Sequence, residues 1–261
     1  MNVKTISSHQ TTQVLLPIIE LGRGWLVVDK PQGISVHNDP GKDLISILNR
    51  RVAADRQLAT SLDCDPEFKV NAVHRLDRET SGVILLACRP EVFAHLSTAF
   101  RRRLVRKRYV AVVHGQMPAS EKENGFQMWE WELTRSAGGR HNPAGKGKRM
   151  ACRTRFRVIN HSGHYTMIAC EPLTGRKHQI RRHAKIAGHA VVGDVRYGSK
   201  RSIRHLIRTR GTCNLCLHAQ SLEFIPPDRS QPVCTRAETP ETMLRLFSDD
   251  TTNTGDYDRQ P

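Results

Sequence analysis

The sequence predicts an α+β domain in which helices and loops flank a mixed, mostly antiparallel sheet. Short apolar runs of strand length recur along the 261 residues, and helical patterns separate some of them but not all. This lack of strict alternation disfavours a doubly wound parallel sheet. Hydrophobic residues make up 38% of the chain, which allows a sizeable core, and no internal repeat is visible.

The first elements lie in the N-terminal quarter of the chain. Trp25–Pro31 reads as a short apolar strand stopped by its proline, and residues 32–37 as a turn followed by an extended piece. Residues 43–50 have helical spacing, with Asp43 as a suitable N-cap. Residues 53–68 carry no clear period, so we expect a loop there.

The central segment contains the clearest alternation of elements. Residues 83–88 form a continuous apolar run, which indicates a buried strand. Pro90 then opens a helix, because proline is tolerated at the first helical position. A basic run, 101–108, follows this helix and leads into a strand at residues 109–113.

A glycine-rich basic segment interrupts the second half of the chain. Residues 135–149 read as a mobile loop between two strand-like alternations, 128–133 and 154–159. Residues 178–187 then read as a helix that ends at a glycine.

A final strand is expected at residues 221–225. Beyond Asp228 the chain becomes polar, and we expect disorder after about residue 248. The predicted organisation is a flexible tail over 1–16, one main domain over 17–228 and a polar, partly disordered extension over 229–261.

The charge of the chain points to a polyanion. Lys and Arg number 41 against 25 Asp and Glu, which gives a net charge of +16 and a pI near 10.1. Such a surface neutralises phosphates and releases condensed counterions, so RNA or DNA is the natural partner. The alternative is a basic surface that binds nothing.

Seven scattered cysteines, an odd number, favour free thiols in a reducing compartment. The N-terminus lacks the pattern of a secretory signal, and no apolar stretch reaches the roughly 18 residues of a membrane span. We therefore expect a cytoplasmic protein without membrane contact, and a monomer. The pair Cys213 and Cys216, with His205 and His218 nearby, suggests zinc, but one such pair is too few ligands, and we expect no metal.

The densest polar motif is the segment His74–Gly82, directly before the buried strand. It combines the carboxylate of Asp77 with basic and hydroxyl neighbours, and loops at strand ends often carry catalytic groups. By spacing alone, a structural turn capped by Asp77 is equally good. A protein-kinase catalytic loop is excluded because the aspartate comes one place late and no glycine-rich ATP loop precedes it.

A second motif, Pro172–His183, concentrates cationic and imidazole groups at a helix start. This pattern suits a phosphate backbone and its bases, although a solvated basic helix is the alternative. From the two motifs we predict that RNA contacts come from His74, Arg75, Thr80, Arg176, His178, Gln179 and His183.

Five blocks, in order, resemble the RluA-type family of pseudouridine synthases over roughly residues 20–226. One matching block alone would be weak evidence for a family, but five blocks in the same order make the resemblance specific. The blocks are Val27–Gly33 with Val36 and His37, His74–Asp77 with Thr80–Gly82, Lys107–Ala111 with Gly115, Thr174–Arg181 with Gly193, Asp194, Tyr197 and Gly198, and Leu217–Ala219 with Leu222 and Phe224.

This resemblance implies the pseudouridine synthase fold and a cofactor-free isomerisation of uridine in ribosomal or transfer RNA. Asp77 would act at the sugar, as a nucleophile at C1′ or by promoting loss of a C2′ proton. Tyr109 would stack on the target base or act as a general base, and Arg181 would pair with Asp77. Arg75 would help to hold the target nucleotide out of the helix, a step that costs a few kcal/mol.

Such enzymes often carry an N-terminal S4-type RNA-binding module, which the roughly 20 preceding residues cannot hold. We therefore expect target choice to come from the basic loop 135–149 and the run 101–108. Two rivals remain. A non-catalytic RNA-binding or ribosome-assembly protein would not need Asp77, Tyr109 and Arg181 together. A nuclease would need a carboxylate cluster for metal ions, which is absent from the sequence near Asp77.

Overall fold

The computed structural model describes residues 16–121 and 124–252. In this part of the chain a ten-stranded sheet has the order β1-β2-β4-β11-β5-β10-β9-β6, with β3 beside β4 and β12 beside β11. Its strands are β1 (Ile18–Gly22), β2 (Trp25–Lys30), β3 (Asn71–Ala72), β4 (Ser81–Ala87), β5 (Arg106–His114), β6 (Gln127–Trp129), β9 (Thr154–His161), β10 (Tyr165–Pro172), β11 (Leu217–Phe224) and β12 (Val233–Arg236). A separate pair joins β7 (Leu133–Thr134) and β8 (Arg149–Met150).

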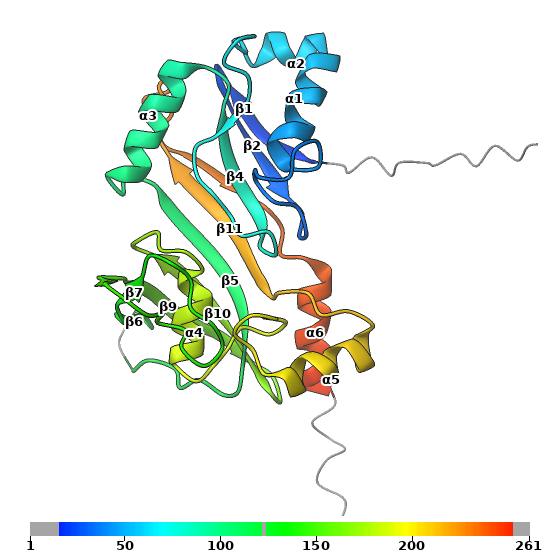
Figure 1. The fold of residues 1–261 in the computed structure, drawn as a ribbon, viewed down its shortest axis with the longest axis vertical. Helices are drawn as coiled ribbons and strands as arrows, with labels where there is room; N and C mark the ends of the chain where they lie inside the picture. Colours follow the sequence, from blue (N-terminus) through cyan, green and yellow to red (C-terminus); the bar gives the residue numbers. More distant parts are fainter. Residues whose placement is uncertain (1–15, 122–123, 253–261) are drawn as a thin grey trace, which may run out of the picture.

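The described helices are α1 (Leu44–Ala54), α2 (Arg56–Ser61), α3 (Pro90–Arg101), α4 (Gln179–Ile186), α5 (Lys200–Arg210) and α6 (Glu241–Thr252). Figure 1 shows α1 and α2 at one end of the molecule and α5 and α6 at the other. The long strands β5 and β11 run between these two ends, so they connect the two halves.

The predicted fold class is confirmed, because the strands of the large sheet pair antiparallel except β4 with β11. In that parallel pair Gly82 lies opposite Ala219, and the φ angle of Gly82 is +110°. A Cβ at Gly82 would come 2.1 Å from the carbonyl oxygen of Ala219. A glycine is therefore required here, and it brings the two strands together directly behind the Asp77 loop.

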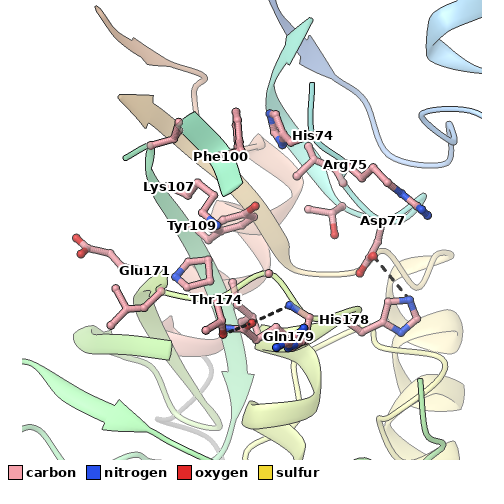
Figure 2. Close-up of a pocket in the computed structure, with 18 of the residues that line it drawn as sticks. His74, Arg75, Asp77, Phe100, Lys107, Tyr109, Glu171, Thr174, His178 and Gln179 are labelled. Carbon is pink, nitrogen blue, oxygen red and sulfur yellow. Dashed lines mark hydrogen bonds and ion pairs between the residues drawn. The ribbon is translucent and has the colours of Figure 1, made fainter. Parts of the chain in front are cut away.

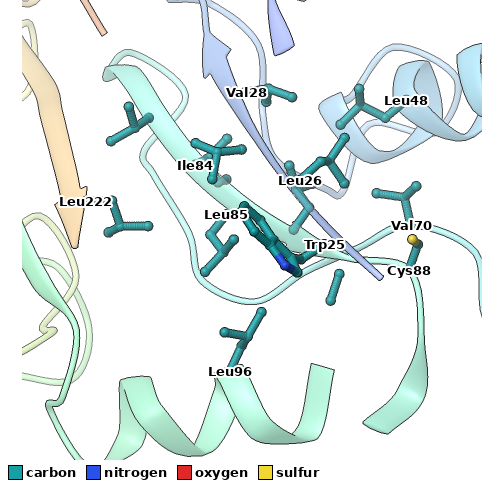
Figure 3. Close-up of a cluster of buried hydrophobic side chains, with 14 of the residues drawn as sticks. Trp25, Leu26, Val28, Leu48, Val70, Ile84, Leu85, Cys88, Leu96 and Leu222 are labelled. Atoms are coloured by element: carbon teal, nitrogen blue, oxygen red, sulfur yellow. The ribbon is translucent and has the colours of Figure 1, made fainter. Parts of the chain in front are cut away.

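Two hydrophobic clusters form the core. The first packs α1 and α3 against β2 and β4 and includes Trp25, Leu85, Leu96 and Leu222 (Figure 3). The second packs α4 and α6 against β5 and β10. Tyr109 on β5 contacts both clusters, so its side chain lies where the two halves of the molecule meet.

The prediction of a loop over residues 53–68 is wrong in part. Helix α1 continues to Ala54, and the six-residue helix α2 follows at once. Asp55 joins them, since its side chain accepts a hydrogen bond from the backbone N–H of Leu58. Six residues with one buried side chain, Leu58, are too few to give a visible helical period.

The boundary expected at residue 228 is also too early. Strand β12 pairs with β11, and α6 buries Met243 and Phe247 in the second cluster. Helix α6 extends to Thr252, into the segment after about 248 for which the sequence predicts disorder, and its packing stabilises it. Residues 253–261, and the tail 1–16 except for the buried Leu16, lie outside the described residues.

Candidate active site

A cleft of about 980 Å³ opens where the two halves of the sheet meet. Several distant segments line it, among them the loop before β4, the start of β5 and the start of α4 (Figure 2). The cleft therefore gathers Asp77, Tyr109 and Arg181, which the sequence analysis placed together. His74, Arg75, Thr80, Arg176, His178 and Gln179 also line it.

Backbone contacts from a buried lysine fix the loop that carries Asp77. Lys30, fully buried at the end of β2, donates from Nζ to the carbonyl oxygens of Pro31, Ile34 and Arg78, at 2.8, 3.0 and 3.2 Å. The Gly33 N–H donates to the same Arg78 oxygen, at 2.9 Å. Burial lowers the pKa of Lys30 to about 8, although nearby carboxylates oppose the shift.

Arg181 contacts three carboxylates. Its Nη1 lies 3.2 Å from Oδ2 of Asp77 and 3.4 Å from Oε2 of Glu79, while Nε and Nη2 donate to the two oxygens of Asp194, at 2.7 and 2.9 Å. The guanidinium is buried, and burial alone would lower its pKa. The hydrogen bonds and charge of Asp194, together with Asp77, outweigh that cost and raise the pKa of Arg181. A permanent positive charge therefore faces Asp77.

Asp194 is in turn held by the backbone. Its Oδ1 accepts hydrogen bonds from the N–H groups of Arg196 and Tyr197, at 3.0 and 2.9 Å. Asp194 is 1% exposed, and within the described part of the chain these two donors and Arg181 compensate its charge. Asp194 belongs to the fourth of the five family-like blocks, and its pattern in the sequence predicted no role for it.

His178 approaches Asp77 from the other side. Its Nε2 lies 3.7 Å from Oδ1 of Asp77 (Figure 2). Its Nδ1 is 3.0 Å from the hydroxyl of Tyr197. The residue precedes α4 in a left-handed conformation, with φ of +54°. Burial lowers its pKa to about 4, with Asp77 opposing, so the imidazole is neutral at physiological pH.

Tyr109 projects from β5 into the cleft, beside Lys107 (Figure 2). Burial, and then the charge of Asp77, raise the pKa of its phenol, so it holds its proton at neutral pH. Burial, and then the charge of Arg103, lower the pKa of Lys107. The cleft thus presents a neutral aromatic surface beside the amine of Lys107.

His74 has a structural partner on each side. Its ring stacks on Phe100, with centroids 4.6 Å apart, and its Nε2 accepts a hydrogen bond from the Leu85 N–H, at 3.0 Å. Burial lowers its pKa to about 3. The predicted RNA contact is therefore limited to a neutral ring that forms part of the cleft wall.

The prediction that His183 contacts RNA is wrong. Its side chain is fully buried, with Nδ1 3.0 Å from Thr154 Oγ1 and Nε2 3.0 Å from the Trp131 carbonyl oxygen. The four-residue spacing from Gln179 placed both on one helix face, but that face points into the protein. Gln179 lines the cleft, but its side-chain amide forms hydrogen bonds with the side chains of Thr174 and Thr154 and with two backbone groups.

The other predicted contacts differ in exposure. Arg75 is exposed and Thr80 is buried. Arg176 is partly buried, and its Nε has no hydrogen-bond partner among the residues that the structure describes. An arginine with an unsatisfied donor on the wall of a basic cleft is suited to bind an anionic group.

The basic loop 135–149 is attached to the domain by Arg182. This fully buried guanidinium donates to the carbonyl oxygens of Thr134, Pro143 and Ala144. The loop was expected to be mobile, yet one of its sides is anchored to α4 by these bonds. Its basic side chains at Lys146, Lys148 and Arg149 remain exposed.

In the described part of the chain, no group of three or more His, Cys, Asp or Glu side chains is placed to hold a metal ion. None of the described helices is long and apolar enough to cross a membrane.

A sequence model of the family described as RNA pseudouridylate synthase matches residues 24–185. The chain belongs to this family.

Curated relatives agree with that assignment. A ribosomal large subunit pseudouridine synthase C from Vibrio vulnificus is 34% identical over 221 residues, covering 85% of this chain and 65% of the relative. The protein of the same name from Escherichia coli K12 is 32% identical over 231 residues, covering 85% and 66%. The chain thus spans slightly less than two thirds of the length of these relatives. A solved structure, human RNA pseudouridylate synthase domain containing 4, is similar in fold, with a TM-score of 0.66 at 21% identity over 88% of this chain and 91% of that one.

Proposed function

We propose that this chain isomerises uridine to pseudouridine in ribosomal RNA, with Asp77 as the catalytic carboxylate. The observation that carries the proposal is the ion pair between Asp77 and the buried Arg181, on the wall of a basic cleft in a chain of this family. The names of the curated relatives favour RNA of the large ribosomal subunit over transfer RNA.

The reaction needs no outside atoms other than protons. The bond from N1 of uracil to C1′ breaks, the base rotates, and C5 forms a new bond to C1′. N1 gains a proton and C5 loses one. Asp77 acts at the sugar, either by attack on C1′ or by promoting loss of the C2′ proton, and both routes require an ionised carboxylate. Arg181 places a positive charge 3.2 Å from Oδ2 of this carboxylate.

The cleft also has to receive a nucleotide taken out of the RNA stack. Tyr109 supplies an aromatic surface, and stacking of a base on such a ring returns about 1–3 kcal/mol of the cost of unstacking. Its raised pKa favours the stacking role over the role of general base. Arg75, exposed at the mouth of the cleft, is available to occupy the place that the nucleotide leaves.

Tritium at C5 of uridine gives a direct test, because C5 must lose its hydrogen. The purified chain should release tritium from labelled large-subunit ribosomal RNA, and Asp77→Asn should reduce the rate at least about 10³-fold, as expected for loss of a catalytic group. A control variant, Asp228→Asn, changes a carboxylate whose oxygens contact Arg23 and Trp25, outside the residues that line the cleft. It should keep the wild-type rate.

Transfer RNA labelled in the same way is the competing substrate. Pseudouridine mapping in cells with and without the gene identifies the site. The proposal fails if the wild-type chain releases no tritium from ribosomal RNA and no site disappears when the gene is removed.

A further inference from the structure

Helix α5 carries a concentration of positive charge outside the cleft. Its eleven residues include five Lys or Arg and no Asp or Glu. Lys200, Arg201, Arg204 and Arg208 are all exposed. Arg201, Arg204 and Arg208 follow one another at spacings of three and four, so their side chains share one face of the helix.

Apart from Arg208 and Arg210 in the last turn, where the helix dipole favours cations, this charge does not stabilise the helix. Lys200 and Arg201 lie in the first turn, where the helix dipole disfavours cations. Like charges four residues apart, as in Arg204 and Arg208, repel each other. Arg210 alone among these five has a carboxylate partner in the described part of the chain, Asp249, to which it forms an ion pair. The remaining four cations therefore have no neutralising group within that part.

The helix is nevertheless firmly attached. Leu206 is buried in the second hydrophobic cluster. Ser199 caps the helix by accepting a hydrogen bond from the Ser202 N–H, at 3.0 Å, and the Ser202 hydroxyl lies 2.8 Å from Nε2 of His114. The arginine face is thus presented by a fixed element.

The start of α5 is also close in the chain to the candidate active site. Tyr197, three residues before the helix, hydrogen bonds to His178, whose other ring nitrogen lies 3.7 Å from Asp77. From Arg201 to Arg208 the helix rises about 10 Å, at 1.5 Å per residue. Figure 1 shows α5 at the end of the molecule opposite α1 and α2.

From these features we infer that the Arg201, Arg204 and Arg208 face of α5 binds the phosphate backbone of the substrate RNA beside the target uridine. The inference rests on the proposed function for its substrate. The arginines would contact the phosphate backbone and not the reacting base, so they would contribute to the affinity for RNA and to its orientation. The chemistry at Asp77 should be independent of them once RNA is bound.

The test compares two triple variants of the full chain. One carries Arg201→Gln, Arg204→Gln and Arg208→Gln. The control carries Arg50→Gln, Arg56→Gln and Arg236→Gln, which remove the same charge from exposed positions on α1, α2 and β12. Affinity for a ribosomal RNA fragment is measured against salt concentration, and tritium release is measured at saturating RNA.

The α5 variant should bind RNA about 10- to 100-fold more weakly near 0.1 M salt. The slope of log affinity against log salt should fall by about 2 to 3, since each lost phosphate contact removes about 0.7 to 0.9. Its rate at saturating RNA should equal that of the wild type. Its thermal midpoint should change little, because the removed repulsion between Arg204 and Arg208 offsets the lost interaction of Arg208 with the helix dipole. The control should change affinity by less than about twofold.

An unchanged salt slope in the α5 variant would overturn the inference, and so would a loss of rate at saturating RNA with unchanged affinity. The first result is also the one expected if α5 instead binds an acidic protein. The two proposals fail separately. A wild-type chain that forms no pseudouridine refutes the proposed function, whereas the salt slope of RNA binding still decides the role of α5.

Discussion

Asp194 binds Arg181 through two hydrogen bonds of 2.7 and 2.9 Å, which leaves Nη1 of Arg181 to face Asp77 at 3.2 Å. The carboxylate of Asp194 is therefore the support that orients the cation beside the proposed catalytic group. Its own orientation is set by two backbone N–H groups in the turn after Gly193.

Asp194→Asn should lower the rate of pseudouridine formation about 10- to 100-fold, comparable with loss of an orienting partner in other sites. The amide keeps an acceptor for the backbone donors but loses the charge and one acceptor for Arg181. Single-turnover tritium release at saturating RNA measures the effect. A rate equal to the wild type would show that Arg181 does not need Asp194 for its orientation.

Arg181→Ala should reduce the free energy of unfolding by about 3–5 kcal/mol, because it leaves the carboxylate of Asp194 buried without its ionic partner. Urea unfolding of the RNA-free protein measures the loss. Arg245→Ala, which breaks the exposed pair with Glu241, is the control and should leave the unfolding midpoint unchanged. Equal midpoints in the two variants would contradict the structural role of Arg181.

The protein should lose stability in mild acid, in part through His74. Its folded pKa of about 3 lies below the unfolded value of 6.5, so the unfolded chain binds more protons in between. The free energy of unfolding therefore falls as the pH falls through this window, by about 3 kcal/mol from pH 6.5 to 4 for this group.

Protonation of His74 would also remove the acceptor for the Leu85 N–H. His74→Gln retains an acceptor oxygen that does not titrate, so the variant should lose less stability between pH 6.5 and 4. Urea unfolding at several pH values compares the free energy of unfolding of the His74→Gln variant with that of the wild type. Identical pH slopes would exclude His74 as a source of acid sensitivity.

Activity should decline above about pH 8, where Lys30 loses its proton. The neutral amine can no longer donate to all three carbonyl oxygens that fix the Asp77 loop. If the charged form is required, the single-turnover rate falls about tenfold per pH unit.

The same deprotonation of Lys30 should raise the free energy of unfolding, whereas it lowers the activity. Its pKa is lowered from 10.5 in the unfolded chain, so its unfavourable contribution is complete below pH 8 and diminishes between pH 8 and 10.5. A decline in rate without loss of folded protein, seen by circular dichroism, distinguishes the two effects. Lys30→Arg should move the decline to higher pH, and a profile that is flat to pH 10 in the wild type would refute this prediction.

Deletion of residues 137–147 should destabilise the protein, because Arg182 would lose the Pro143 and Ala144 carbonyl oxygens while remaining buried. Such a deletion cannot separate RNA contact from folding. Lys146→Gln, Lys148→Gln and Arg149→Gln leave those carbonyl groups in place. If the loop contributes to target binding, the triple variant should weaken RNA affinity with an unchanged thermal midpoint, and unchanged affinity would exclude that role.

The sequence alone determined the strands at 25–31, 83–88 and 109–113, the helix opened by Pro90 and the helix after His178. Each has a strong local signal, either an apolar run, a proline at the first helical position or a helical period closed by glycine. The five ordered blocks determined the family, and with it the grouping of Asp77, Tyr109 and Arg181.

Only the tertiary structure decided which polar side chains serve the cleft and which serve the fold. His183 and Gln179 share a helix face by spacing, but burial depends on β9 and the loop before β7, which pack against that face. Asp194 and Lys30 gained their roles from partners brought close by folding. Asp77 and Arg181 are 104 positions apart in the chain, so their contact is a property of the assembled sheet and not of any local pattern.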